Sequence, residues 1–433
     1  MSAKSIKTDK SKKSLNTAKE VYPLLKAYYQ EANRVKKDRS KKVGWVTGAG
    51  VVDLTWVFDN VLPVYPENFN ASCAAKQITP PLLEISESAG FARDLCGYFR
   101  NTYGYMLGGK NLDLPFAGGG MPEPDFLLGD SGACMFHLKW WRQMERFYDY
   151  KVPTFILEVP YITPRMTLDQ IEEHYLEYTV DQIKRCLNFL EEVTGKKLDE
   201  DRLKEVVRLS GEASALFEEV QQLRKNVPSP AASEDMLSCL MPIVQWAGSQ
   251  EAVDFYRRLR DEVKERVEKG IGVIENERFR LLFDNIPPWY TLGIFNYLHN
   301  FDAVSVIETY TQYFHYSRGR MDPAKPYESL ARKYLYGVWY MTSLRQKLPH
   351  LIIPKALDYQ VDGIISFILY GCKISSGFLP YQRKIFEEKY GIPTLILEGD
   401  MVDPRDYADA QVKNRIEAFF EMLETRKQAR KWV

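Results

Sequence analysis

The fold is easiest to predict from residues 361–400, which read VDGIISFILYGCKISSGFLPYQRKIFEEKYGIPTLILEGD. An apolar strand pattern leads to Cys372, then to a helical pattern, a tyrosine-containing turn and a second apolar strand that begins at a proline. Residues 124–161 repeat this order around Cys134 as PDFLLGDSGACMFHLKWWRQMERFYDYKVPTFILEVPY. The repetition predicts two similar units, each with a thiol at the C-terminal edge of its sheet, where open α/β sheets bind ligands.

Strand and helix patterns alternate over much of the chain, which is typical of parallel sheets built from βαβ units. Outside the repeat, the predicted strands are KVGWV (42–46), LPVYPE (62–67), RFRLLFDNI (278–286) and AVSVIETYT (303–311). The sequence therefore predicts an α/β fold with two similar parallel-sheet domains of the flavodoxin or Rossmann kind, joined by a helical segment.

The composition changes along the chain and suggests four parts. We expect an N-terminal helical arm at 1–41, a first α/β domain at 42–165, a helical segment at 166–275 and a second α/β domain at 276–433. The arm is rich in lysine, and the helical segment carries the 3.6-residue apolar periodicity of amphipathic helices.

The overall charge excludes some classes of partner. Lys+Arg and Asp+Glu are equal at 58 each among 433 residues, so the net charge is zero, which argues against nucleic acid or an anionic membrane as a partner. No apolar run approaches the roughly 20 residues of a membrane span, and the N-terminus lacks the apolar core of a signal peptide. We expect a soluble, cytoplasmic protein.

Six cysteines occur, and none forms a C-x-x-C pair. The simplest role of a cysteine is that of a small buried apolar side chain, which we expect for Cys186 and Cys239 and favour for Cys73. Cys134 and Cys372 differ because they recur at matching places, each just before a helix whose N-terminal amides favour a thiolate.

Cys96, in the polar and aromatic stretch ARDLCGYFRNTYG, is a third candidate ligand. A catalytic cysteine would need a nearby base, and His137 is the neighbouring histidine that could serve, although packing is its more ordinary role. Three thiols brought together between two domains suit an iron–sulfur cluster better than a single nucleophile.

The chain resembles the 2-hydroxyacyl-CoA dehydratase / benzoyl-CoA reductase family over nearly its whole length beyond the arm. The stretches that carry the resemblance are VYPENFNASCAAKQI, DLCGYFRNTYG, MPEPDFLLGDSGACMFHLKWW, VPTFILEVPY, FILYGCKISSG and VDPRDYADAQVKNRIEAFFEML. The resemblance implies a [4Fe–4S] cluster at the domain interface, bound by Cys96, Cys134 and Cys372. One iron would then lack a protein thiolate and be open to the substrate thioester.

The resemblance also implies partners. Family members pair two related subunits and receive electrons from a separate ATP-hydrolysing iron–sulfur activator, with ferredoxin as the indirect donor. The present chain has no G-x-x-x-x-G-K-[ST] phosphate loop, which is consistent with ATP being hydrolysed on another subunit.

Two activities occur in this family. Its dehydratase subunits commonly carry glutamate–asparagine–histidine after the second strand, whereas this chain has Glu67, Asn68 and Phe69, and a phenyl ring transfers no proton. The C-terminal run looks more like the larger, B-type subunit of ATP-dependent benzoyl-CoA reductase, which reduces benzoyl-CoA to a cyclic dienoyl-CoA. A subunit of a radical 2-hydroxyacyl-CoA dehydratase is the alternative.

The sequence also leaves open the role of Glu67 and the function of the cysteines. Glu67 is a candidate polar group near the substrate, or it simply accepts bonds from backbone amides. The protein could hold a cluster as a scaffold without acyl-CoA chemistry, or all six cysteines could only pack.

Overall fold

The computed structural model describes residues 14–48, 50–132, 134–161, 173–314, 321–342 and 347–430. Residues 1–13 of the predicted arm lie outside this part of the chain, as do 162–172, which span the predicted boundary between the first domain and the helical segment. The divisions at 41/42, 165/166 and 275/276 stay predictions.

Within the described residues, eight strands form two four-stranded sheets in which neighbouring strands pair in parallel. The first sheet has the order β2-β1-β3-β4 and contains β1 (Lys42–Val46), β2 (Val61–Val64), β3 (Phe126–Asp130) and β4 (Thr154–Leu157). The second sheet has the order β6-β5-β7-β8 and contains β5 (Phe279–Asp284), β6 (Ala303–Glu308), β7 (Gly363–Leu369) and β8 (Thr394–Gly399). The two sheets share one topology, which confirms the predicted pair of similar parallel-sheet domains.

Helices cover both sheets, as parallel sheets with apolar residues on both faces require. In the first part of the chain they are α1 (Asn16–Asp38), α2 (Val52–Thr55), α3 (Pro66–Ala75), α4 (Thr79–Ser88), α5 (Gly97–Met106) and α6 (Met135–Phe147). The middle of the chain contains α7 (Glu173–Thr194), α8 (Glu200–Leu223), α9 (Ser233–Ser238), α10 (Met241–Gln245) and α11 (Gln250–Glu268). The last part contains α12 (Gly293–Leu298), α13 (Pro326–Thr342), α15 (Ile353–Asp358), α16 (Lys373–Ser376), α17 (Leu379–Ile385) and α18 (Asp409–Arg430).

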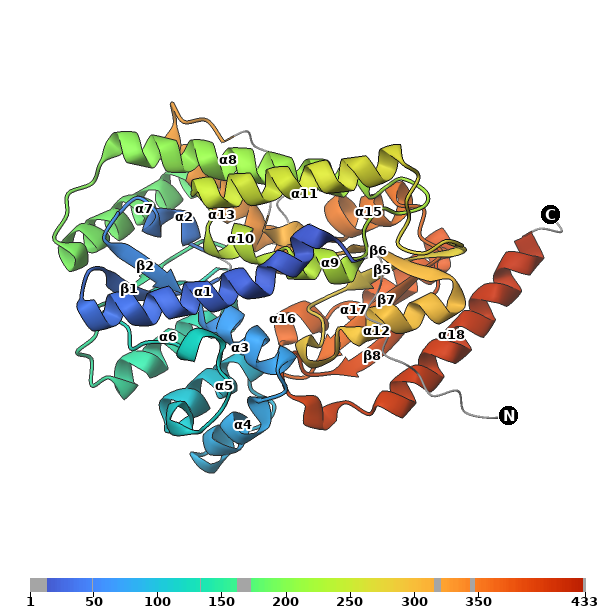
Figure 1. Ribbon diagram of the computed structural model, residues 1–433, viewed down its shortest axis with the longest axis horizontal. Helices are drawn as coiled ribbons and strands as arrows, with labels where there is room; N and C mark the ends of the chain where they lie inside the picture. The colour runs from blue at the N-terminus through green and yellow to red at the C-terminus, as the bar shows by residue number, and fades with distance from the viewer. Residues whose placement is uncertain are drawn as a thin grey trace.

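Three long helices tie the two sheets together. Figure 1 shows α8 and α11 side by side along the top of the molecule, reaching from the first sheet toward the second, with α1 running below α11 and in contact with it. The start of α1 is held by carboxylates of the middle segment, because Ser14 donates to Asp235 and Thr17 donates to Glu262. The N-terminal arm is therefore part of the folded core from residue 14 onward.

The core is shared between distant parts of the sequence. One apolar cluster contains residues of α1, β1, α5, α11, β5, β7 and α18, so it runs through both sheets. A second cluster joins the other face of the first sheet to α7 and to Leu330 and Trp339 of α13. Because α13 comes from the predicted second domain, the second half of the chain supplies a covering helix to the first sheet. No helix within the described ranges has the length and apolarity needed to cross a membrane.

Close packing of α4 on α5 depends on a glycine. A Cβ added at Gly104 of α5 would lie 1.8 Å from the Leu82 carbonyl oxygen of α4, which is far inside van der Waals contact with rigid backbone. Any side chain at this position would push the two helices apart.

We therefore predict that Gly104→Ala lowers the free energy of unfolding by about 1–3 kcal/mol or more, since overpacked interiors must shift backbone to relieve the clash. Denaturant unfolding monitored by circular dichroism measures the change. Gly293→Ala is the matched control: a Cβ there meets nothing within 4 Å, so stability should stay the same or rise slightly. Equal losses in the two variants would contradict the packing argument.

Candidate functional site

The strand order brings the ends of both sheets to one cavity. In each sheet the order reverses between its two inner strands, β1 and β3 or β5 and β7, and ligands of open α/β sheets bind at such a switch point. A cavity of about 550 Å³ lies where the loops after the strands of the two sheets meet. Seven of its lining residues follow β1, β2, β3, β5, β6, β7 and β8, namely Gly48, Glu67, Cys134, Asn285, Tyr310, Cys372 and Met401.

Three thiols line this cavity: Cys96, Cys134 and Cys372. Each lies immediately before a helix, since α5 begins at Gly97, α6 at Met135 and α16 at Lys373. The repeated stretches of the sequence thus place Cys134 and Cys372 at equivalent positions, after β3 and after β7. All four residues predicted for the site, including Glu67, line the same cavity.

Burial and neighbouring thiols make two of these cysteines, Cys134 and Cys96, hard to ionise. Burial, and then the neighbouring thiols of Cys372 and Cys96, raise the pKa of Cys134 well above its usual range. Burial also raises the pKa of Cys96 to about 12, with a smaller contribution from Cys372. The sulfurs of Cys372 and Cys96 therefore lie near enough to Cys134 to affect its ionisation.

Local donors face two of the sulfurs. The Phe136 amide donates to Cys134 Sγ at 3.3 Å, and the Ser375 hydroxyl donates to Cys372 Sγ at 3.0 Å. Such donors stabilise negative charge on sulfur and so favour its ligand form.

The donor set suits an iron–sulfur cluster. Among the residues that the structure describes, no group of three or more His, Cys, Asp or Glu side chains is arranged around a single metal ion. A cluster differs from a single ion because each thiolate ligates a separate iron, so its ligands need not converge on one point. Three soft sulfur donors on one mostly apolar cavity are the ligands that iron–sulfur clusters use in proteins.

The remaining cysteines pack into apolar cores. Cys73 and Cys239 belong to the cluster that runs through both sheets, and Cys186 belongs to the cluster between the first sheet and α7. Burial raises the pKa of each of these thiols.

A polar chain lies beside the thiols on the first-sheet side of the cavity. His137 Nε2 lies 3.1 Å from Glu67 Oε1, and its Nδ1 lies 3.3 Å from Asp130 Oδ2. Asp130 is held in place by the Thr47 hydroxyl, which donates to Oδ2 at 2.7 Å, and by the Gly132 amide, which donates to Oδ1 at 3.2 Å. Burial lowers the pKa of His137, but the Asp130 charge and the hydrogen bonds to Asp130 and Glu67 outweigh burial and raise this pKa to about 10.

The sequence favours a packing role for His137, but in the structure this residue does more than pack. Its ring is buried, but it also lines the cavity and bridges two carboxylates. Sequence reasoning missed Asp130, although a carboxylate at the carboxyl end of an inner strand is a recognisable signal of a site residue. The contact between Glu67 and His137 joins residues that are 70 positions apart, so only the folded chain reveals it.

Sequence comparison places the chain among known proteins. The family model of the D-component of 2-hydroxyglutaryl-CoA dehydratase matches residues 55–423. The chain belongs to this family. The (R)-phenyllactyl-CoA dehydratase alpha subunit of Clostridium sporogenes is 28% identical to it, over 91% of this chain and 92% of the relative. The B-type subunit of benzoyl-CoA reductase from Thauera aromatica is 30% identical over 92% of both chains, and the (R)-2-hydroxyisocaproyl-CoA dehydratase alpha subunit of Clostridioides difficile is 27% identical over 92% of this chain and 94% of the relative.

These relatives of the 2-hydroxyglutaryl-CoA dehydratase family include dehydratase subunits and a reductase subunit at similar identity. The position that we compared with the dehydratase histidine, Phe69, is wholly buried and packs its ring against those of Tyr29, Tyr105 and Phe116. Helix α3 instead faces the cavity with Glu67, Asn68 and Ala71. The absence of an imidazole at Phe69 therefore does not leave the cavity without one, because His137 lies next to Glu67 on its wall.

We predict that Phe69→His lowers the free energy of unfolding by about 1–3 kcal/mol, because it buries a polar ring among apolar ones. Turnover per folded chain should stay unchanged, since this ring packs in the core. Chemical denaturation and an activity assay normalised to folded protein measure the two effects. Phe69→Leu, which stays apolar, should lose less stability, and a Phe69→His variant that gained activity at full stability would contradict this placement.

Proposed function

We propose that the chain is the larger cluster-bearing subunit of an ATP-dependent benzoyl-CoA reductase, an oxidoreductase that converts benzoyl-CoA to a cyclic dienoyl-CoA. The observation that carries the proposal is that three thiols open onto one cavity whose remaining wall is largely apolar and aromatic. The reaction needs both features in one place, a metal centre and a dry pocket for a flat ring.

In this proposal Cys96, Cys134 and Cys372 would hold a [4Fe–4S] cluster. When bound, such a cluster supplies single electrons of low potential. The ligand set rests on the common cavity and on the proximity of Cys372 and Cys96 to Cys134, whose pKa they raise.

The cavity wall supports an aromatic acyl group. Tyr98, Trp289 and Tyr310 line it, and the Trp289 indole donates to the Tyr98 hydroxyl at 2.5 Å. Rings that are fixed by such bonds offer flat apolar faces to a substrate ring and exclude water from it. Exclusion of water also keeps stray protons away from a strongly reducing site.

Glu67 and His137 are the groups that would handle protons beside the substrate. They face each other across 3.1 Å on the cavity wall, and Asp130 orients the imidazole from its other side. A carboxylate and an imidazole in contact can pass a proton between them, which ring reduction also requires.

The relatives are named as subunits, which supports a multi-subunit enzyme. We expect a smaller homologous cluster-bearing subunit, ATP-hydrolysing iron–sulfur activator subunits, and ferredoxin as the indirect electron donor. We also expect a cytoplasmic location, where thiols stay reduced.

A subunit of a radical 2-hydroxyacyl-CoA dehydratase is the second candidate. The observation that favours it is the Glu67–His137 contact, because an imidazole at the cavity provides the proton chemistry that Phe69 does not provide. The aromatic wall suits a phenyl-bearing 2-hydroxyacyl group as well as a benzoyl group.

The two candidates predict different products from one experiment. The complex, purified without oxygen together with its partner subunits, is supplied with ATP, a strong reductant and either benzoyl-CoA or (R)-phenyllactyl-CoA. We expect benzoyl-CoA to be converted to a cyclic dienoyl-CoA, detected by mass spectrometry as the gain of two hydrogen atoms. Dehydration of phenyllactyl-CoA without ring reduction would replace the first proposal by the second.

We predict that replacing any of Cys96, Cys134 and Cys372 by serine removes most of the iron, since serine offers no thiolate. Iron and sulfide analysis of anaerobically purified protein measures the loss. Cys186→Ser is the control. Cys186 lies on α7 and packs in the apolar cluster between this helix and the first sheet, so its replacement should not change the iron content. Equal loss of iron in the control would show that the ligand assignment is wrong.

A further inference from the structure

Cys96 reaches the cavity by a different route from the other two thiols. Cys134 and Cys372 follow β3 and β7, which are inner strands of their sheets, so the topology alone places them. Cys96 lies between α4 and α5, and no strand end in the described part of the chain positions it. Other contacts must therefore hold this thiol beside the rest.

A buried arginine lies directly behind Cys96. Arg100 is fully buried, its amide donates to the Cys96 carbonyl oxygen at 3.0 Å, and its Nε donates to the Leu95 carbonyl oxygen at 3.1 Å. The same guanidinium donates to Glu87 at 2.7 Å and to Asp403 at 3.4 Å. The Arg100 side chain thus binds the carbonyl next to Cys96, and its charged end binds Glu87 and Asp403 and forms a longer ion pair with Asp400 at 3.9 Å.

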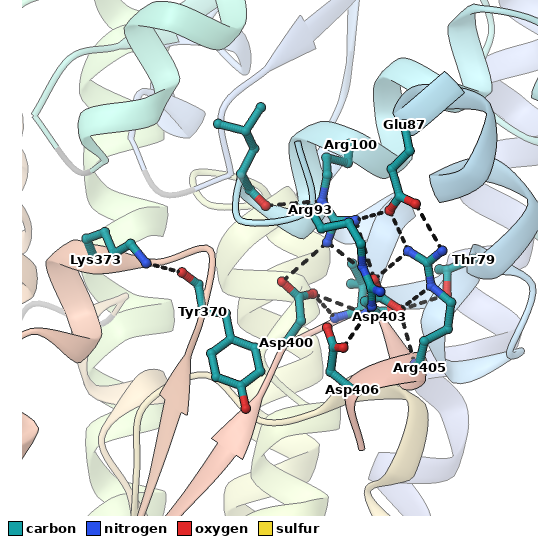
Figure 2. A network of polar contacts seen from close by, with 12 residues as sticks. Thr79, Glu87, Arg93, Arg100, Tyr370, Lys373, Asp400, Asp403, Arg405 and Asp406 are labelled. Carbon is teal, nitrogen blue, oxygen red and sulfur yellow. Dashed lines mark hydrogen bonds and ion pairs between the residues drawn. The ribbon is translucent and has the colours of Figure 1, made fainter. Parts of the chain in front are cut away.

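The partners of Arg100 come from both halves of the molecule. Glu87 belongs to α4, whereas Asp403 lies in the turn after β8 of the second sheet. Arg405 closes the group by donating to Asp403 at 2.7 Å and to Glu87 at 2.5 Å. Figure 2 shows these four side chains, which we call the Arg100 cluster (Glu87, Arg100, Asp403 and Arg405), converging from the two sides.

Two glycines allow the segments to meet. A Cβ at Gly371 would lie 2.8 Å from the Leu95 carbonyl oxygen and 3.0 Å from Cys96 Cα, so the loop before Cys372 touches the backbone of Cys96. A Cβ at Gly97 would lie 2.2 Å from Asp400 Oδ1, which accepts bonds from the amides of Val402 and Asp403. The backbone around Cys96 is therefore seated against the second half at two points.

We propose that the Arg100 cluster is a positioning device for the metal centre: it fixes Cys96, which no described strand end places, at the second half of the molecule beside Cys372. This role rests on the ligand set of the proposed function. The arginine fork suits it, because a planar guanidinium binds carboxylates and a carbonyl oxygen at once in a defined geometry.

The charge state of the cluster is consistent with this role. Burial acts to raise the pKa of Asp403, but bonds from Arg405 and the charges of Arg405 and Arg100 outweigh burial and lower it. Buried ion pairs contribute little net stability compared with well-packed apolar side chains, yet they define geometry. Defined geometry is what a three-thiol ligand set needs.

The structure contains a matched control for this cluster. Arg224 is also fully buried, and it forms a two-pronged pair with Glu308, donating at 3.0 Å and 2.7 Å. This pair joins the C-terminal end of α8 to β6. The other side-chain partners of Arg224 are Gln221 and Ser233, and neither belongs to a loop that carries a proposed ligand. Both arginines are fully buried and paired with carboxylates, but only Arg100 of these two contacts the backbone next to Cys96.

The experiment compares Arg100→Lys with Arg224→Lys in the full-length chain. Lysine keeps the charge and loses the fork. The iron-free proteins are treated with iodoacetamide under anaerobic conditions, and alkylation of each cysteine is followed by mass spectrometry. We expect Arg100→Lys to speed alkylation of Cys96 by roughly tenfold or more, because a buried thiol reacts through local opening and the lost bonds make opening easier. Alkylation of Cys186 should not change.

The iron content gives the second readout. After reconstitution, Arg100→Lys should hold less iron per chain than Arg224→Lys, and the visible spectrum of the remaining iron should differ from that of the unsubstituted protein. Should Arg100→Lys fail to fold, Asp403→Asn compared with Glu308→Gln repeats the comparison. Unchanged alkylation of Cys96, or equal acceleration in the Arg224→Lys protein, would overturn the proposal.

The two proposals fail in different ways. Faster alkylation of Cys96 in Arg100→Lys, in a chain that never binds iron, would support the positioning of this loop and overturn the ligand set. A normal cluster in both the unsubstituted and Arg100→Lys proteins would support the ligand set and overturn the role of the Arg100 cluster.

Discussion

The strands of both sheets run parallel, and this common direction determines where the candidate site lies. Because neighbouring strands run the same way, the loops that follow them gather at one edge of each sheet. The two sheets share one order, and residues after seven of the eight described strands line a common cavity. Cys134 and Cys372 are more than 200 residues apart in the sequence, and this arrangement brings them to one cavity.

The same arrangement explains why the thiols need further support. Mostly apolar side chains from the loops after the strands and from α1 line the cavity, and burial raises the pKa of Cys96 to about 12. Such thiols stay protonated near neutral pH, and binding of a metal centre must displace the proton. Donors to sulfur from Phe136 and Ser375 lower the cost of that step. The site is thus unfavourable for free thiolates and favourable for thiolates that a metal centre neutralises.

Much of the fold could be predicted from the alternation of patterns, because strand and helix periodicities are local. The repeat around Cys134 and Cys372 also identified equivalent places in the two sheets, as the shared topology confirms. Cys96 had no such repeat: its polar and aromatic setting made it a candidate, and the family resemblance implied its place in the ligand set. The contacts of His137 were missed because Glu67, its partner, lies on α3 after another strand, and side-chain contacts between distant elements depend on tertiary packing. For the same reason the position of α13 against the first sheet had no counterpart in the local pattern.

The two repeats differ in the residue three positions after the cysteine, and this residue makes different contacts on the two sides of the cavity. Three positions after Cys134 lies His137, which turns to Glu67 and Asp130. Three positions after Cys372 lies Ser375, whose hydroxyl turns back to the sulfur of Cys372 itself. One turn of helix separates these side chains from their cysteines, so each of them lies on the same helix face as the cysteine before it. The first repeat therefore places an imidazole between two carboxylates, whereas the second places a hydroxyl donor on its own cysteine sulfur.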